Sequence, residues 1–162
     1  AIVTLDGYFS ANVDYAKIVV AERYHNLGHS VGIIKGFHLT NGAIASTIAH
    51  DSHNVIIAGT NDDDMILAAN TLREIGGGEV VVNNGQVTTL PLAIGGLMSD
   101  HSYQHVIKTN NTLRAAFSKI SDIKFDPFLT LSFMALPVIP SLKITDQGLF
   151  DFNQFAFINI QD

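Results

Sequence analysis

The 162-residue chain contains no cysteine, and only 15% of its residues are charged. The absence of cysteine excludes a disulfide framework, a thiolate nucleophile, an iron–sulfur cluster and a cysteine-based zinc site. It also agrees with a reducing compartment, so the cytoplasm is the expected location. The charged fraction is well below the roughly 25% of an average domain, which predicts a surface partly covered by another body.

Basic runs and long apolar runs are also lacking. Fifteen acidic residues against nine basic ones give a net charge of −6, so a nucleic acid partner is not expected. No stretch approaches the roughly 18 consecutive apolar residues of a membrane span, and no signal peptide opens the chain. We therefore expect no membrane partner. Because the first residue is Ala1 and not methionine, we expect either a processed start or a piece of a longer protein.

The chain is rich in short apolar runs. Hydrophobic residues make up 47% of it, and neither a repeat nor a linker divides it, so we expect a single domain over residues 1–162. Runs rich in β-branched residues predict several strands, joined in part by tight turns such as Asn84-Gly85. Alternating aromatic residues predict a final strand over 150–160, after an extended segment from Pro137 to Pro140.

Three segments have helical signals. Thr60 is expected to cap a helix that runs to a glycine triplet, and Ser99 or Asp100 is expected to cap a second helix. Asp126, followed by proline, is typical of an N-cap and predicts a short helix over 128–135. Together these elements predict an α+β fold, with a mixed, largely antiparallel sheet of several strands and two or three packed helices.

The most unusual local feature is the polar insert His50-Asp51-Ser52-His53-Asn54 between two apolar runs. Its side chains are expected to emerge together at one edge of a sheet, where loops often carry function. A carboxylate such as Asp51 would hold a neighbouring imidazole in one tautomer, which suits acid–base chemistry, and His50 and His53 could share a divalent metal with it. The alternative is a tight turn in which the polar side chains bind backbone amides.

Two other pairs have chemical potential. His101 and His105 have the i, i+4 spacing of metal ligands, but no glutamate accompanies them, so we interpret them as solvated surface. Arg23 could clamp a carboxylate, although an ion pair with Glu22 is the favoured interpretation.

Several segments, taken in chain order, resemble one family. They are Ile34 to Phe37, Asn41 to Ser46, Ala49 to Asn54, Gly59 to Asp62, Gly76 to Gly78, Gly95 to Ser99, Asp126 to Phe128 and Leu136 to Pro140. This set resembles the C-terminal domain of bacterial adenine deaminase, in the amidohydrolase superfamily, over nearly the whole chain.

The resemblance implies that the full-length protein hydrolyses adenine to hypoxanthine and ammonia in purine salvage or catabolism; a related aminopurine is the alternative substrate. It also implies manganese or iron, held by a His-x-His pair, further histidines and acidic residues on an N-terminal (β/α)8 barrel. This chain has no His-x-His and is too short for a barrel of roughly 250 residues. We therefore expect no metal or cofactor ligand in it, and the isolated chain should be inactive.

The partners implied are adenine, the N-terminal barrel and further copies of the same protein in a homo-oligomer. Our site hypothesis is that the polar loop reaches the mouth of the barrel, where His50, Asp51 or His53 acts as a catalytic residue. There it would close over adenine or support the metal shell. The alternatives are a purely structural domain that covers the barrel or joins subunits, and a free-standing domain that binds a small ligand without catalysis.

Overall fold

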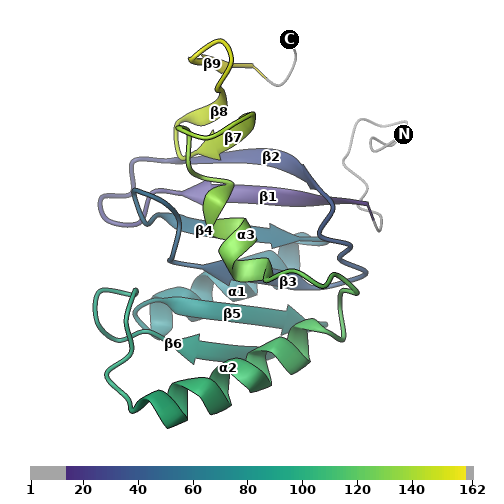
Figure 1. Cartoon of the computed structure of the whole chain (residues 1–162), viewed down its shortest axis with the longest axis vertical. Helices are drawn as coiled ribbons and strands as arrows, with labels where there is room; N and C mark the ends of the chain where they lie inside the picture. Colours follow the sequence, from purple (N-terminus) through teal and green to yellow (C-terminus); the bar gives the residue numbers. More distant parts are fainter. Residues whose placement is uncertain (1–13, 160–162) are drawn as a thin grey trace.

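The computed structural model describes residues 14–159, which form two antiparallel sheets and three helices (Figure 1). In chain order the elements are β1 (Tyr15–Ala21), β2 (His29–Lys35), β3 (Ala43–Ser46), β4 (Val55–Gly59), α1 (Asp62–Glu74), β5 (Gly78–Asn83), β6 (Gln86–Pro91), α2 (Tyr103–Phe117), α3 (Pro127–Phe133), β7 (Leu142–Thr145), β8 (Gly148–Asp151) and β9 (Ala156–Ile158). The predicted α+β class is confirmed.

The main sheet has six strands in the order β2-β1-β4-β3-β5-β6, and a smaller sheet has the order β7-β8-β9. Each neighbouring pair is antiparallel. The hairpins follow from local turn chemistry: Asn84 and Gly85 both have positive φ, as the predicted type I′ turn between β5 and β6 requires.

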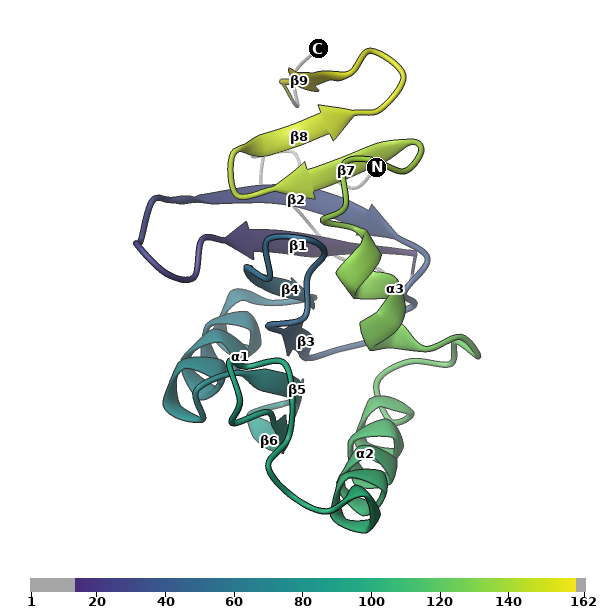
Figure 2. The same cartoon turned by 60° about the vertical axis from the view of Figure 1, so that its left-hand side comes forward.

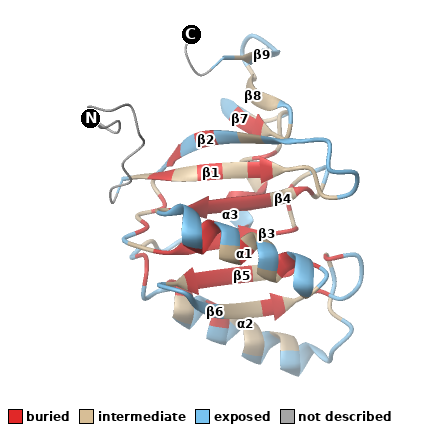
Figure 3. Cartoon of the chain, turned by 180° about the vertical axis from the view of Figure 1, so that it is seen from behind, coloured by how far each residue is buried: buried red, intermediate tan, exposed pale blue. Residues whose placement is uncertain are grey.

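The helices cover the two faces of the main sheet unequally. On one face α2 packs on β5 and β6, α3 packs on β3 and β4, and the small sheet packs on β2 and β1. On the other face α1 packs on β3, β4 and β5. Figure 2 shows α1 on one side of the sheet and α2 and α3 on the other, and Figure 3 shows β1 and β2 uncrossed by any helix on the α1 side.

Each face has its own apolar core, because successive side chains of a strand point to opposite faces. The face under α2 and α3 buries large side chains, among them Ile18, Val20, Leu113 and Leu131. The core beneath α1 contains Ala43, Ala45, Ile57, Met65, Ala68, Leu72, Val80 and Val82. The alanines in it let the helix backbone approach the strands closely. A Cβ at Gly59 would lie 2.5 Å from Cγ of Met65, so this position also depends on the absence of a side chain.

The observed N-caps differ from the predicted residues in two of the three helices. Asn61, not the predicted Thr60, is the N-cap of α1, and its Oδ1 accepts the Asp64 amide at 2.8 Å. The Thr60 hydroxyl instead donates to the carbonyl of Gly42. Ser102 caps α2, in place of the predicted residues a turn earlier. The third prediction is confirmed, since Asp126 caps α3 by accepting two backbone amides.

The C-terminal segment differs from the prediction in two places. The predicted strand over 150–160 is interrupted, because the Asp151 carboxylate accepts the Asn153 and Gln154 amides and Phe155 has a φ of 50°. Its described part is therefore the end of β8, a turn and β9. The segment from Pro137 to Pro140 forms turns in place of the predicted extended chain.

Candidate functional site

The polar loop His50–Asn54 joins β3 to β4 and lies against the end of α3. The His50 amide donates to the carbonyl of Ser132 at 3.1 Å, and the His50 ring centroid is 5.0 Å from that of Phe133. Within the loop, the His53 amide donates to the carbonyl of Ala49 at 2.6 Å. The loop lies at the end of two inner strands of the sheet, and its side chains do not all emerge as predicted, because Asp51 and Ser52 are exposed whereas Asn54 is buried.

The structure brings the two loop histidines together. Their ring centroids are 5.8 Å apart at 66°, and both residues are half-buried, whereas Asp51 is exposed. The Nδ1 atom of His53 is buried and has no hydrogen-bond partner among the described residues. A buried imidazole nitrogen left unpaired costs about 1–3 kcal/mol, so the conformation of His53 is locally unfavourable and depends on the packing around it.

The residues present do not fit a metal centre. Within residues 14–159 no group of three histidine, cysteine, aspartate or glutamate side chains is placed to hold a metal ion. This counts against the metal that His50 and His53 were considered able to share with Asp51. The ring centroids of His101 and His105 are 4.4 Å apart, and both side chains are exposed, as a solvated surface pair would be.

A hollow of about 310 Å³ opens beside the loop. Its polar lining comes from Asp51, Ser52, Thr145, Asp146 and Gln147, and its apolar lining from Ala135, Pro137, Val138 and Phe157. Carboxylate, amide and hydroxyl groups can hydrogen-bond to a polar ligand, and an aromatic ring can stack on a flat one. The hollow is therefore the part of this site with room for a small molecule.

Asn54 ties the loop to segments far away in the sequence. Its Oδ1 accepts the Arg23 amide at 3.3 Å, and its Nδ2 donates to Oδ1 of Asp146 at 3.1 Å. Asn54 thus binds a backbone amide 31 positions away in the sequence, not an amide of its own turn as in the tight-turn alternative. No local pattern pointed to Asp146, because the contact spans 92 positions.

The predicted ion pair between Arg23 and Glu22 is replaced by other contacts. The Glu22 carboxylate accepts the amides of Tyr24, His25 and Leu27. Burial acts to raise the pKa of Glu22, but these backbone hydrogen bonds outweigh it and lower the pKa. Glu22 therefore organises the β1–β2 turn, where backbone amides are closer than a cation.

The Arg23 guanidinium lies against two glycines. Its Nη2 donates to the carbonyl of Gly76 at 3.2 Å, while Nη1 is buried without a partner among the described residues. A Cβ at Gly77 would lie 2.9 Å from Nη2 of Arg23, and a Cβ at Gly96 would lie 2.7 Å from its Cζ. The glycine triplet thus ends α1, as predicted, and also gives the guanidinium room to reach the backbone.

Glu79 on β5 was not identified from the sequence. The pKa of Glu79 is raised to about 7, chiefly by burial and to a smaller extent by the Asp126 carboxylate, while the Arg114 guanidinium opposes the shift. Arg114 and Asp126 form an ion pair between α2 and the start of α3. The signal for Glu79 was its register, since it alternates with Val81 and therefore points to the face covered by α2 and α3.

None of the three helices in the described part of the chain is both long and apolar enough to cross a membrane.

Comparison with known proteins identifies the family. A model of the adenine deaminase C-terminal domain matches residues 2–156. An adenine deaminase of Leuconostoc citreum is 82% identical over 157 residues, which is 97% of this chain and 28% of the relative. Those of Leuconostoc mesenteroides and Oenococcus oeni are 78% and 66% identical over 156 residues each, covering 96% and 95% of this chain. This chain spans 28% of the length of these two relatives as well. The resemblance predicted from the motifs is thereby confirmed, and the chain belongs to the adenine deaminase C-terminal domain family.

Proposed function

We propose that this chain is the C-terminal part of an adenine deaminase, a hydrolase that converts adenine and water to hypoxanthine and ammonia. The observation that carries the proposal is the identity of 82% to a relative named adenine deaminase, over 97% of this chain. Because the chain spans 28% of that relative, the activity belongs to the whole protein. A role in purine salvage or catabolism follows from the substrate.

The catalytic metal belongs elsewhere in this proposal. The described residues form no metal-binding group, so manganese or iron, which the resemblance implies, would be held by the barrel outside this chain. We assign no step of the reaction to that metal here. Assembly of the whole protein into a homo-oligomer and its cytoplasmic location stay predictions.

The contribution we propose for this chain is closure of the substrate site by the loop His50–Asn54. His50 and His53 are half-buried in this loop, and imidazole nitrogens can donate to or accept from a purine edge. The exposed Asp51 carboxylate can accept an N–H of the substrate, and the hollow beside it can admit a planar ring. The loop would thus position adenine and exclude water from it.

The test is kinetic. In the full-length enzyme, replacing both loop histidines (His50→Ala with His53→Ala) should lower kcat/KM for adenine by more than tenfold, because the contacts that orient the substrate are lost. The control is the pair His101→Ala with His105→Ala, which removes two exposed imidazoles and should leave kcat/KM unchanged. Unchanged kinetics of the loop variant, with an unchanged unfolding midpoint, would show that the domain is purely structural.

A further inference from the structure

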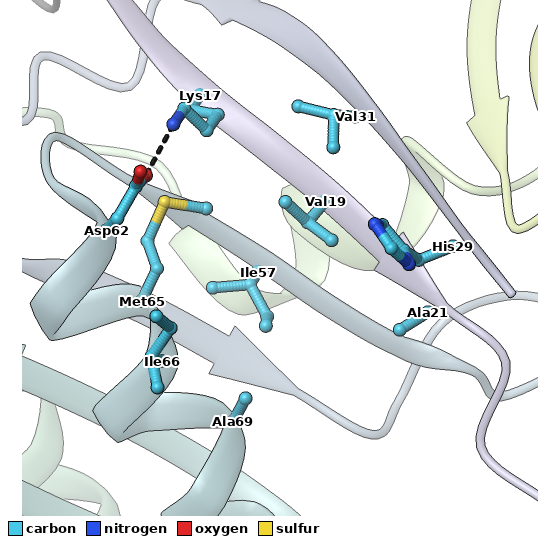
Figure 4. Close-up of a pocket in the computed structure, with 10 residues that line it drawn as sticks. All are labelled: Lys17, Val19, Ala21, His29, Val31, Ile57, Asp62, Met65, Ile66 and Ala69. Carbon is cyan, nitrogen blue, oxygen red and sulfur yellow. Dashed lines mark hydrogen bonds and ion pairs between the residues drawn. The ribbon is translucent and has the colours of Figure 1, made fainter. Parts of the chain in front are cut away.

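A groove of about 380 Å³ runs along the face of the main sheet that carries α1 (Figure 4). Three strands form its floor, where Ile57, Val19 and Val31 lie side by side because Val19 is in register with both neighbours. The wall on the α1 side consists of Met65, Ile66 and Ala69. The middle of the groove is therefore an apolar surface built from four elements.

This groove is the place where one layer of the fold is incomplete. Helix α1 packs on β3, β4 and β5, so no helix within residues 14–159 lies over β1 and β2 on this face (Figure 3). Val31 is 43% exposed, Ile33 is 45% exposed and Ile66 is 59% exposed. Two strands are about 10 Å wide, which matches the diameter of about 10 Å of one helix. The uncovered area therefore has the width of a single missing helix.

The opposite face of the same two strands is covered by packed side chains. Ile18 and Ile34 are buried there, and a Cβ at Gly32 would lie 3.2 Å from Cδ1 of Ile144 on β7. Successive residues of β2 thus alternate between a packed face and a bare apolar face. Solvent alone does not account for valine and isoleucine on the bare face, because water would favour polar residues at these positions.

Charged and polar side chains lie at the two ends of the groove. Lys17 forms an ion pair with Asp62 near one end, and His29 lines the other (Figure 4). The middle of the groove therefore suits an occupant with one continuous apolar face. An amphipathic helix has such a face, and it keeps its opposite, polar face toward solvent.

The route of the chain indicates where such a helix comes from. Most of the length of the relatives lies outside the part matched by this chain, which is 28% of each. The polypeptide that precedes Tyr15 enters the described fold through β1, and β1 is one of the floor strands of the groove. The preceding part of the protein therefore continues directly into one of the two strands that α1 does not cover.

We propose that the groove docks an apolar-faced helix from the preceding part of the same polypeptide, as an intramolecular contact. The inference rests on the proposed function in that it takes this chain to be one part of a longer deaminase. It adds the surface of contact and the kind of element that fills it. The docked helix lies beside α1 and covers β1 and β2 on this face of the sheet.

Thiol labelling of the full-length protein tests this directly. Val31→Cys and Ile66→Cys place a thiol on the floor and the wall of the groove, and these 162 residues contain no other cysteine. Ile107→Cys on α2 is the matched control, because Ile107 is 55% exposed against 59% for Ile66. Alkylation under native conditions, followed by peptide mapping, should be at least tenfold slower at positions 31 and 66 than at position 107.

Two results would overturn the inference. Equal labelling rates at all three positions would show an open groove. Protection that disappears on dilution, together with dissociation of the oligomer in gel filtration, would show that a second copy fills it. Protection that is independent of protein concentration supports the intramolecular helix.

The result also separates this inference from the proposed function. A groove that is labelled freely in a protein that deaminates adenine overturns the docking inference alone. A protected groove in a full-length protein with no activity on adenine supports docking and contradicts the proposed function.

Discussion

The two faces of the main sheet are completed to different extents by this chain. On one face α2, α3 and the small sheet together cover all six strands, and on the other α1 covers the central strands and leaves β1 and β2 bare. The same two strands therefore contribute buried side chains to one core and exposed apolar side chains to the opposite surface. Within residues 14–159, one face of the sheet is thus covered completely, whereas the other leaves an apolar surface over two strands.

The largest expected effect comes from breaking the fully covered face. Leu113 on α2 is completely buried. Leu113→Ala should lower the free energy of unfolding by about 3 kcal/mol, because the truncated side chain leaves a cavity and its apolar contacts are lost. Ile66→Ala, on the groove side of α1, should change it by less than about 0.5 kcal/mol in the chain alone. Urea denaturation measures both. Equal losses would mean that the two faces do not differ in the way described.

A second prediction concerns the buried carboxyl of the fully covered face. The ordinary pKa of Glu79 is 4.5, and the fold raises it to about 7. Between these values the folded chain binds more protons than the unfolded chain, so the contribution of Glu79 is fully present below pH 4.5 and is lost as the pH rises through 7. We expect the free energy of unfolding to fall by about 2 kcal/mol between pH 5 and pH 8.

Glu79→Gln should remove most of this fall, because glutamine stays neutral. The control is Glu74→Gln at an exposed position of α1, which should keep the pH dependence of the original chain. Denaturation curves at several pH values provide the measurement. A Glu79→Gln chain that still loses stability above pH 6 would assign the effect to another group.

The smallest expected effect concerns the N-cap of α1, the helix on the partly covered face. Asn61→Ala removes the side chain that accepts the Asp64 amide, and should lower the free energy of unfolding by about 1 kcal/mol. Asp63→Asn, in the first turn of α1, leaves the cap in place and should cost less than about 0.5 kcal/mol. Thermal unfolding of both variants gives the comparison. A larger loss for Asp63→Asn would contradict Asn61 as the cap.

Much of the fold follows from local patterns. β-branched runs and the Asn84-Gly85 turn predicted the strands of the main sheet, and the Asp126-Pro127 pair predicted the start of α3. Local chemistry could not distinguish Thr60 from Asn61 as the cap of α1, because both side chains can accept an amide. The choice depends on the carbonyl of Gly42, which lies just before β3 and accepts the Thr60 hydroxyl.

The candidate site was predictable in its loop and not in its surroundings. A polar insert between two buried strands indicated His50 and His53, but Phe133, Asp146 and Gln147 reach the loop only through tertiary packing. Arg23 shows the same limit. Its neighbour Glu22 was the obvious partner in sequence, yet folding brings the carbonyl of Gly76 within reach.

The bare face of β1 and β2 also bears on how the protein is made. Domains generally fold in the order of synthesis, from the N-terminus onward. In a protein arranged like the relatives, the ribosome would complete the docking helix before β1 and β2 leave the exit tunnel. The newly formed groove would then meet its occupant at once, which limits the time during which its apolar surface is open to aggregation.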